Sequence, residues 1–356
     1  MAWSEPEVKR PKLDHRGGCD DEGRPVFVDD DGDLSLHVGP EGKTATYVVC
    51  AKTLARHSPI FRRMLFGGFK ESKPLDGSDW VIELPEDSPE GFKIFLDMVH
   101  GWFGRVPEEL SLDQLVDVLI ITEKYDATAI TRPWARGWLK AVEDSTSGFG
   151  LLCAAWELGD MATFEKMILK IIDEAECSAD ESRRLIYDGY YADEIKYLEP
   201  PGLFEAIKEL RSALVAAHMA PYVEIYDVLA KPGGSKLPFC PLTDEKAWRT
   251  CDNLVLGSLI MGLMRSNVNI TAKDPADDFT GSLESLKGIL RRLRIEATDH
   301  PYSRRCEDNL QGRRQRGTAQ EMEIRAEHVI IKQEHVDYIT KQAHKTGLDK
   351  IDDDED

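Results

Sequence analysis

The sequence predicts an α+β protein in which a small sheet covered by helices is followed by a mostly α-helical C-terminal region. Two observations lead to this prediction. Between residues 33 and 84, three short stretches carry the apolar–polar alternation of half-buried strands. After residue 150, apolar residues instead recur at the three- and four-residue spacing of an amphipathic helix. At 356 residues, the chain is long enough for two domains or more.

Residues 1–31 come before the first regular pattern. They are polar, charged and rich in Gly and Asp, so they are predicted to form a disordered N-terminal tail. Within this tail, the basic stretch Lys9–Lys12 matches a minimal nuclear-import signal. A solvated charge cluster is the favoured interpretation, because four residues make a weak motif.

The predicted sheet begins with a hairpin. Residues 33–38 alternate apolar and polar side chains, residues 39–43 contain two glycines and a proline, and residues 44–49 return as a second strand. A third strand is predicted over residues 80–84. This sheet opens a domain that we expect to cover residues 32–142.

Three serines mark the beginnings of the helices that cover this sheet. Ser58 and Ser88 each precede a proline, which suits the first helical position because its missing N–H is not needed there. Ser111 and Gln114 have the spacing of a capping box. Helices over a small sheet, within roughly 110 residues, make an α+β domain of ordinary size.

Several phenylalanines of this region fall at helical spacing, which is typical of core positions. They are Phe61, Phe66, Phe69, Phe92 and Phe95. Phe69 differs from the others because it follows the glycine pair that ends a helix and precedes Lys70 and Glu71. It is therefore predicted to lie on a loop, where exposed aromatic residues commonly bind partners.

The ordered set of residues resembles the centre of a BTB/POZ domain. It consists of Leu54, Ser58, Pro59, Phe61, Met64 and the stretch Phe69–Ser72. Asp33–Val38 is similar to the first strand of that family, and Ile82–Pro85 with the following helix is similar to its third strand and next helix. The resemblance covers about residues 30–142. Cys50-Ala51 and His100 stand where many members have His-Lys and tyrosine, as in fungal BTB/POZ proteins with a helical C-terminal extension.

The resemblance implies a non-enzymatic protein–protein interaction module that self-associates or binds another BTB protein. It also implies a substrate adaptor for a cullin-type ubiquitin ligase, because Phe69-Lys70-Glu71 matches the apolar–any–acidic pattern of cullin-binding members. Phe69 would anchor in an apolar groove, and Glu71 would pair at its rim. Alternatively, Phe69 folds back onto its own core and Glu71 is solvated. A second function is a nuclear regulatory or transcription-associated scaffold, which would use Lys9–Lys12 and the basic loop 304–316.

Beyond residue 150, the sequence predicts helices and no strand of any length. We expect a first helical region over residues 150–230 and a second over residues 240–345, joined by a loop rich in Gly and Pro. In the second region, the last helix is predicted to cover about residues 318–345. Residues 346–356 are predicted to be a solvated acidic tail. The resemblance implies that the helices extend the partner surface.

Composition narrows the functional classes. The net charge of −20 argues against a chain that binds nucleic acid as a whole. The motifs of hydrolases, nucleotide-binding loops and zinc proteases do not occur in the sequence, so an enzyme is not expected. The N-terminus lacks the apolar core of a signal peptide, and no run of 18 apolar residues occurs. An intracellular protein, nuclear or cytoplasmic, without a membrane span is therefore predicted.

The seven cysteines are odd in number and widely spaced, which does not indicate a disulfide framework. Four residues of the second helical region are nevertheless candidate ligands of a structural zinc ion. They are Cys240, Cys251, His300 and Cys306. Their spacing is looser than that of zinc fingers, and the favoured alternative is that the cysteines are buried small apolar residues.

Overall fold

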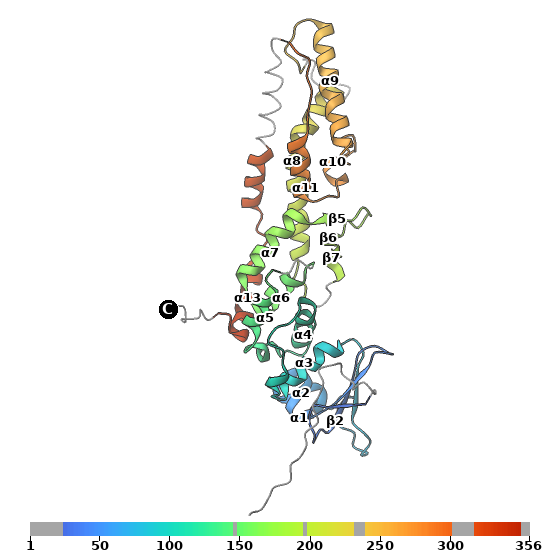
Figure 1. Cartoon of the computed structure of the whole chain (residues 1–356), viewed down its shortest axis with the longest axis vertical. Helices are drawn as coiled ribbons and strands as arrows, with labels where there is room; N and C mark the ends of the chain where they lie inside the picture. The colour runs from blue at the N-terminus through green and yellow to red at the C-terminus, as the bar shows by residue number, and fades with distance from the viewer. Residues whose placement is uncertain (1–23, 145–147, 195–197, 231–238, 301–316, 350–356) are drawn as a thin grey trace, which may run out of the picture. The chain divides into compact units, whose positions relative to one another are not determined.

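The computed structural model describes residues 24–144, 148–194, 198–230, 239–300 and 317–349, and these ranges confirm the α+β class (Figure 1). The chain divides into two compact units. Unit 1 comprises Met1–Asp144, Glu157–Gly159 and Gln342–Asp356, and unit 2 comprises Ser145–Trp156 and Asp160–Lys341. Within the described ranges, no helix combines the length and apolar character needed to cross a membrane.

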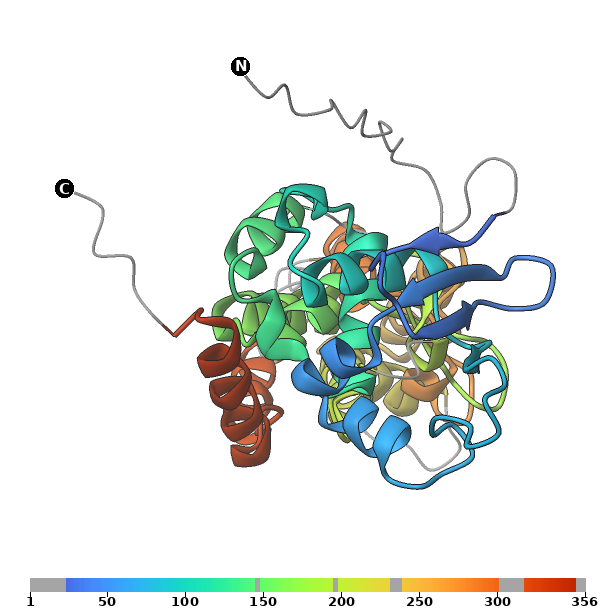
Figure 2. The same cartoon turned by 90° about the horizontal axis from the view of Figure 1, so that it is seen from below.

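Unit 1 contains a four-stranded sheet with the order β1-β3-β2-β4. The strands are β1 (Val26–Phe27), β2 (Leu34–Val38), β3 (Ala45–Val49) and β4 (Val81–Leu84). The predicted hairpin is confirmed, because β2 and β3 pair antiparallel, and the predicted third strand pairs parallel to β2. Alternate residues of β2 and β3 are buried, and Figures 1 and 2 show the helices of this unit on one side of the sheet.

The sequence predicts an N-terminal tail over residues 1–31, but the first strand already begins at Val26. Residues 1–23 lie outside the described ranges, but Val26 and Phe27 form β1, which pairs parallel to β3. Val28 is buried, and its carbonyl accepts a hydrogen bond of 2.7 Å from Trp102 Nε1. Three consecutive apolar residues therefore join the sheet despite their charged surroundings, and the first unit begins before residue 32.

The helices lying within unit 1 are α1 (Ala51–His57), α2 (Pro59–Phe66), α3 (Pro89–Val99), α4 (Leu112–Lys124) and α5 (Ala135–Val142). Three of them, α2, α3 and α4, begin at the predicted serine caps. The Ser58 and Ser88 hydroxyls accept the predicted bonds from the backbone at the starts of α2 and α3. Both bonds of the capping box at Ser111 are present.

The core of unit 1 is aromatic. Phe61 is fully buried and stacks on Tyr125 with ring centroids 4.3 Å apart, and Phe92 and Phe95 pack around the same pair. The Tyr125 hydroxyl donates a 2.6 Å hydrogen bond to Asp87. Burial, followed by the nearby Asp87 carboxylate, raises the pKa of Tyr125 far above its usual range, so the phenol stays a donor.

Unit 2 is mostly helical but contains a small sheet that the sequence analysis missed. The elements lying within this unit are α7 (Met161–Glu174), β5 (Glu176–Cys177), β6 (Leu185–Tyr187), β7 (Tyr190–Tyr191), α8 (Leu203–Ala230), α9 (Glu245–Met264), α10 (Pro275–Asp278) and α11 (Leu283–Arg292). The prediction of no strands after residue 150 is wrong, because β5, β6 and β7 pair antiparallel. Strands of two or three residues are too short to show an alternating pattern. Gly159 and Asp160 separate α7 from the helix before it, α6 (Gly150–Leu158), whereas α8 continues through Pro221.

The last predicted helix, 318–345, is two helices. Residues 317–327 are helical, residues 328–332 are not, and α13 (Gln333–Thr346) follows. Met322 and Val329 are both exposed, so no apolar stripe joins the two helices into one. The predicted acidic tail also begins too early, because Thr346 belongs to α13 and its hydroxyl donates to Leu158 O at 2.6 Å within unit 1. Residues 350–356 lie outside the described ranges.

The two helical regions predicted over residues 150–230 and 240–345 contribute to one unit rather than two, because α8 packs against α7, α9, α10 and α11. A buried arginine in α8 strengthens this association. The Arg211 guanidinium donates to Ala175 O at 3.0 Å, to Cys177 Sγ at 3.2 Å and to Thr280 O at 3.4 Å, and also contacts Gly281 O. One side chain thus connects β5 to the segment before α11.

Candidate functional site

The candidate partner-binding residues lie on the loop that follows α2. Helix α2 ends at Gly67, and Gly68 adopts a φ of +80°, a conformation that favours glycine. The loop is held by Ser72, whose hydroxyl accepts from Gly68 N at 3.1 Å and whose backbone N–H donates to Phe69 O at 3.0 Å. The residues from 69 onward are therefore presented on an ordered turn.

Phe69 is 55% exposed, so its ring does not fold back into the core. Phe61, Phe92 and Phe95 are buried as predicted, whereas Phe66 is half-exposed and its ring meets Trp80 edge-on. The sequence pattern placed Phe66 with the core residues. It is the last residue of α2, at the edge of the core.

Lys70 and Glu71 form an ion pair with each other, with Nζ and Oε1 3.6 Å apart. Lys70 is fully accessible, whereas the Glu71 side chain is largely covered, and the Glu71 carbonyl accepts a 2.8 Å bond from Trp80 Nε1. An ion pair of this exposure contributes at most about 1 kcal/mol. The Glu71 carboxylate therefore loses little if it exchanges Lys70 for a cation on a partner.

Beside this loop lies a groove of about 470 Å³ between α1 and α2. Its lining includes Phe66 and Gly67 together with the exposed residues Arg56, Arg62 and Arg63. The Phe69 ring lies next to Gly67, since a Cβ built there would be 3.0 Å from Phe69 Cε2. An apolar surface with a basic border thus occurs in a chain whose overall charge is −20. The arginines were visible in the sequence, but their position beside Phe69 was not.

His100 caps the start of α1, where Cys50 supplies no side-chain cap. Its Nε2 accepts from Cys50 N at 3.3 Å, so the ring proton is on Nδ1, which donates to Leu96 O at 3.0 Å. Burial lowers the pKa of His100, which favours this neutral form. The two departures from the BTB/POZ pattern are therefore in direct contact with each other.

The candidate zinc ligands fall in unit 2, where the structure brings three of them together. Cys240, Cys251 and His300 place their donor atoms within 4.8 Å of one another. The His300 Nε2 atom lies 3.5 Å from Cys240 Sγ and 3.7 Å from Cys251 Sγ. Both cysteines are fully buried, carry thiols rather than a disulfide, and pack with Leu242, Trp248 and Ala297.

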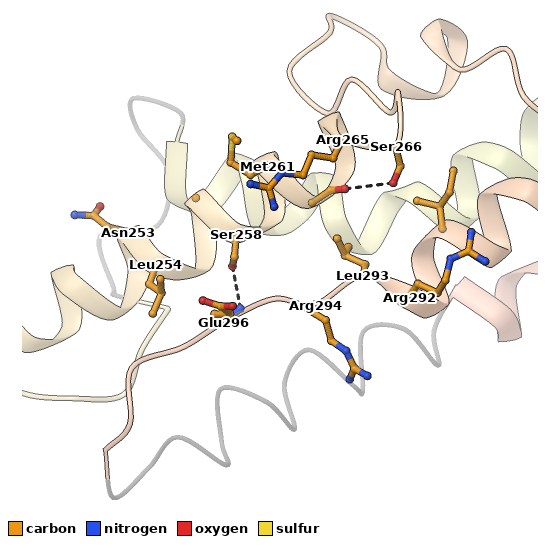
Figure 3. A pocket seen from close by; sticks show the side chains of 13 residues that line it. Asn253, Leu254, Ser258, Met261, Arg265, Ser266, Arg292, Leu293, Arg294 and Glu296 are labelled. Carbon is orange, nitrogen blue, oxygen red and sulfur yellow. Dashed lines mark hydrogen bonds between the residues drawn. The ribbon is translucent and has the colours of Figure 1, made fainter.

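Hydrogen bonds on α9 hold the other two segments of this cluster in place. The Asp252 carboxylate accepts from Phe239 N at 3.2 Å and from Cys240 N at 2.9 Å. Burial raises the pKa of Asp252 against the effect of these two bonds. Nearly two turns further along α9, Ser258 Oγ accepts from Glu296 N at 2.9 Å, which positions the chain that leads to His300 (Figure 3).

The segment that leads to His300 also borders a groove of about 490 Å³ in unit 2. Figure 3 shows this groove between α9 and residues 292–296. Gly262 leaves room for Leu293 against α9, since a Cβ there would be 2.5 Å from Leu293 Cδ1.

Three further sets of predicted residues lie outside the described ranges. They are Lys9–Lys12, the basic loop 304–316 and Cys306.

Comparisons with known proteins identify no family for this chain. No protein-family model matches it, and no curated protein matches its sequence. The geometry of the two candidate sites is therefore what any functional statement rests on, together with the resemblance of residues 30–142.

Proposed function

We propose that unit 1 is a non-enzymatic protein–protein interaction module of BTB/POZ type that self-associates. The order of its elements supports this proposal, because the hairpin, the two short helices, the third strand and the following helices occur where the resemblance implies them. The observation that carries its role in binding a different partner is the exposure of Phe69 on an ordered loop beside a groove with three arginines.

The partner-binding surface of this module consists of Phe69, Phe66 and the arginines of the α1–α2 groove. A central aromatic side chain buried by a partner contributes roughly 2 kcal/mol or more to binding. Arginines at the border add register and association rate rather than affinity, so the partner surface is apolar at its centre and acidic at its edge. Lys70 and Glu71 pair with each other in the free chain, so on binding Lys70 can pair with this acidic edge and Glu71 with a cation elsewhere on the partner.

A cullin-type scaffold is the partner that the Phe69-Lys70-Glu71 pattern implies, and the module would then act as a substrate adaptor for a ubiquitin ligase. The test is a binding titration of the full chain with a purified cullin amino-terminal domain. Phe69→Ala is expected to weaken binding at least tenfold, about 1.4 kcal/mol, because the anchor is lost. Glu71→Ala is expected to weaken it less.

Phe27→Ala is the matched control, because Phe27 lies in the same unit and is 56% exposed, as Phe69 is 55% exposed. It should bind like the wild type. Circular dichroism and the melting temperature establish that each variant is folded. Absence of binding by the wild type, or equal losses for Phe27→Ala and Phe69→Ala, would remove the adaptor function and leave the interaction module.

A further inference from the structure

We propose that Cys240, Cys251 and His300 bind a structural zinc ion that stabilises unit 2. This site is independent of the interaction surface on unit 1. Its three donors come from three separate segments. Cys240 precedes α9, Cys251 lies within α9, and His300 follows the extended chain after α11.

The two sulfur–nitrogen distances match those of a tetrahedral zinc site. Zinc binds thiolate sulfur at about 2.3 Å and imidazole nitrogen at about 2.0–2.1 Å. With tetrahedral angles of about 109°, a sulfur and a nitrogen bound to one ion are therefore about 3.6 Å apart. The observed sulfur–nitrogen separations are 3.5 and 3.7 Å. All three donor atoms lie within 4.8 Å of one another, and both sulfur–nitrogen pairs meet the geometry of a shared ion.

The chemistry of the donors favours zinc over harder cations. Thiolate and imidazole ligands suit zinc, whereas magnesium and calcium require oxygen ligands. On binding, each thiol releases its proton, and the two thiolates balance the charge of Zn²⁺. The site is then electrically neutral, which suits the apolar surroundings formed by Leu242, Trp248 and Ala297.

Hydrogen bonds around the site fix the positions of the segments that carry the ligands. Asp252 fixes the backbone of Cys240, and Ser258 fixes the segment that carries His300, so both are aligned with Cys251 on the same helix. Outer contacts of this kind orient metal ligands. Burial of the cysteines as small apolar residues does not account for an imidazole nitrogen directed at both sulfur atoms.

Zinc content of the full-length chain, purified without chelator, tests the site. Elemental analysis should find about one zinc per chain, and X-ray absorption should find sulfur at about 2.3 Å and nitrogen at about 2.0–2.1 Å. Cys251→Ser and His300→Ala should each weaken zinc binding by more than the roughly 10- to 100-fold typical of outer contacts. Cys50→Ser, which removes a thiol in unit 1, should leave zinc content unchanged.

A stability measurement keeps the test decisive if a ligand variant folds poorly. A chelator should lower the melting temperature of the wild type and of Cys50→Ser, and should leave that of Cys251→Ser unchanged. Wild-type protein that holds no zinc and gains none on titration with zinc chloride would overturn the proposal. A Cys240–Cys251 disulfide found by mass spectrometry of unreduced protein would overturn it as well.

Discussion

The interactions that stabilise the interior of unit 1 differ from those that stabilise the interior of unit 2. The centre of unit 1 is a stack of aromatic rings around Phe61, and its neighbours are apolar side chains of a sheet and its covering helices. Polar contacts supplement apolar packing in unit 2, where Arg211 is buried among backbone carbonyls and Glu321 is surrounded by basic residues. Both units bury apolar and polar side chains, including Asp87 in unit 1, so the difference concerns these centres. A substitution at Phe61 acts by changing volume, and one at Arg211 or Glu321 acts by changing charge and hydrogen bonding.

This difference has consequences for how each unit fails. A ring removed from an apolar core costs the transfer free energy of its atoms and leaves a cavity. A removed polar partner costs less packing but leaves buried acceptors without donors, and each such acceptor costs about 1–3 kcal/mol.

Phe61→Ala is expected to lower the free energy of unfolding of unit 1 by about 3–5 kcal/mol, because the buried ring leaves a cavity beside Tyr125. Denaturant unfolding measures the loss, and hydrogen exchange should place it in residues 24–144. Phe66→Ala is the control on the same helix, where a half-exposed ring should cost about 1 kcal/mol. Equal losses for the two variants would contradict an aromatic core centred on Phe61.

Arg211→Ala is expected to lower the stability of unit 2 by about 2–4 kcal/mol, because the carbonyls of Ala175 and Thr280 lose their donor. Faster hydrogen exchange should appear around β5 and the start of α11. Arg249→Ala removes an exposed arginine paired with Glu245 and should cost less than about 1 kcal/mol. If Arg211→Ala is as mild as Arg249→Ala, polar contacts do not hold this unit together.

The same difference explains what the sequence could predict. Ser58, Ser88 and Ser111 are local signals, and each helix begins where its serine indicates. By contrast, Arg211 and Thr280 are 69 residues apart, and their contact depends on how α8 and α11 pack. The approach of His300 to Cys251 is of the same kind. Their residue types made His300 and Cys251 candidate zinc ligands in the sequence, but only the fold brings their donor atoms together.

The acid response of unit 2 depends on Glu321. Its carboxylate bonds Lys287 at 2.6 Å, His218 at 2.9 Å and Arg325 at 3.0 Å. Burial alone would raise the pKa of Glu321, but these hydrogen bonds outweigh burial and lower it to about 2. A carboxyl whose pKa is lowered in the folded state stabilises the fold above its unfolded pKa, and that contribution is lost as pH falls from about 4.5 to about 2.

Glu321→Gln should therefore reduce the free energy of unfolding by about 1–3 kcal/mol near neutral pH. The difference from the wild type should shrink as pH falls below about 4.5, because the wild-type carboxylate is then protonated. Urea unfolding at several pH values measures it. Glu323→Gln, an exposed change on the same helix, should show no such dependence. A difference between Glu321→Gln and the wild type that stays constant down to about pH 2 would contradict the role of this carboxylate.

Protein interaction through unit 1 is tested most directly by the mass of the full-length chain in solution. Light scattering at micromolar concentration should give about twice the chain mass of 40.1 kDa, the value for a symmetric dimer. Phe69→Ala should give the same mass, because its predicted role is to bind a different partner. A mass of 40.1 kDa at every concentration, for wild type and variant alike, would contradict a self-associating module.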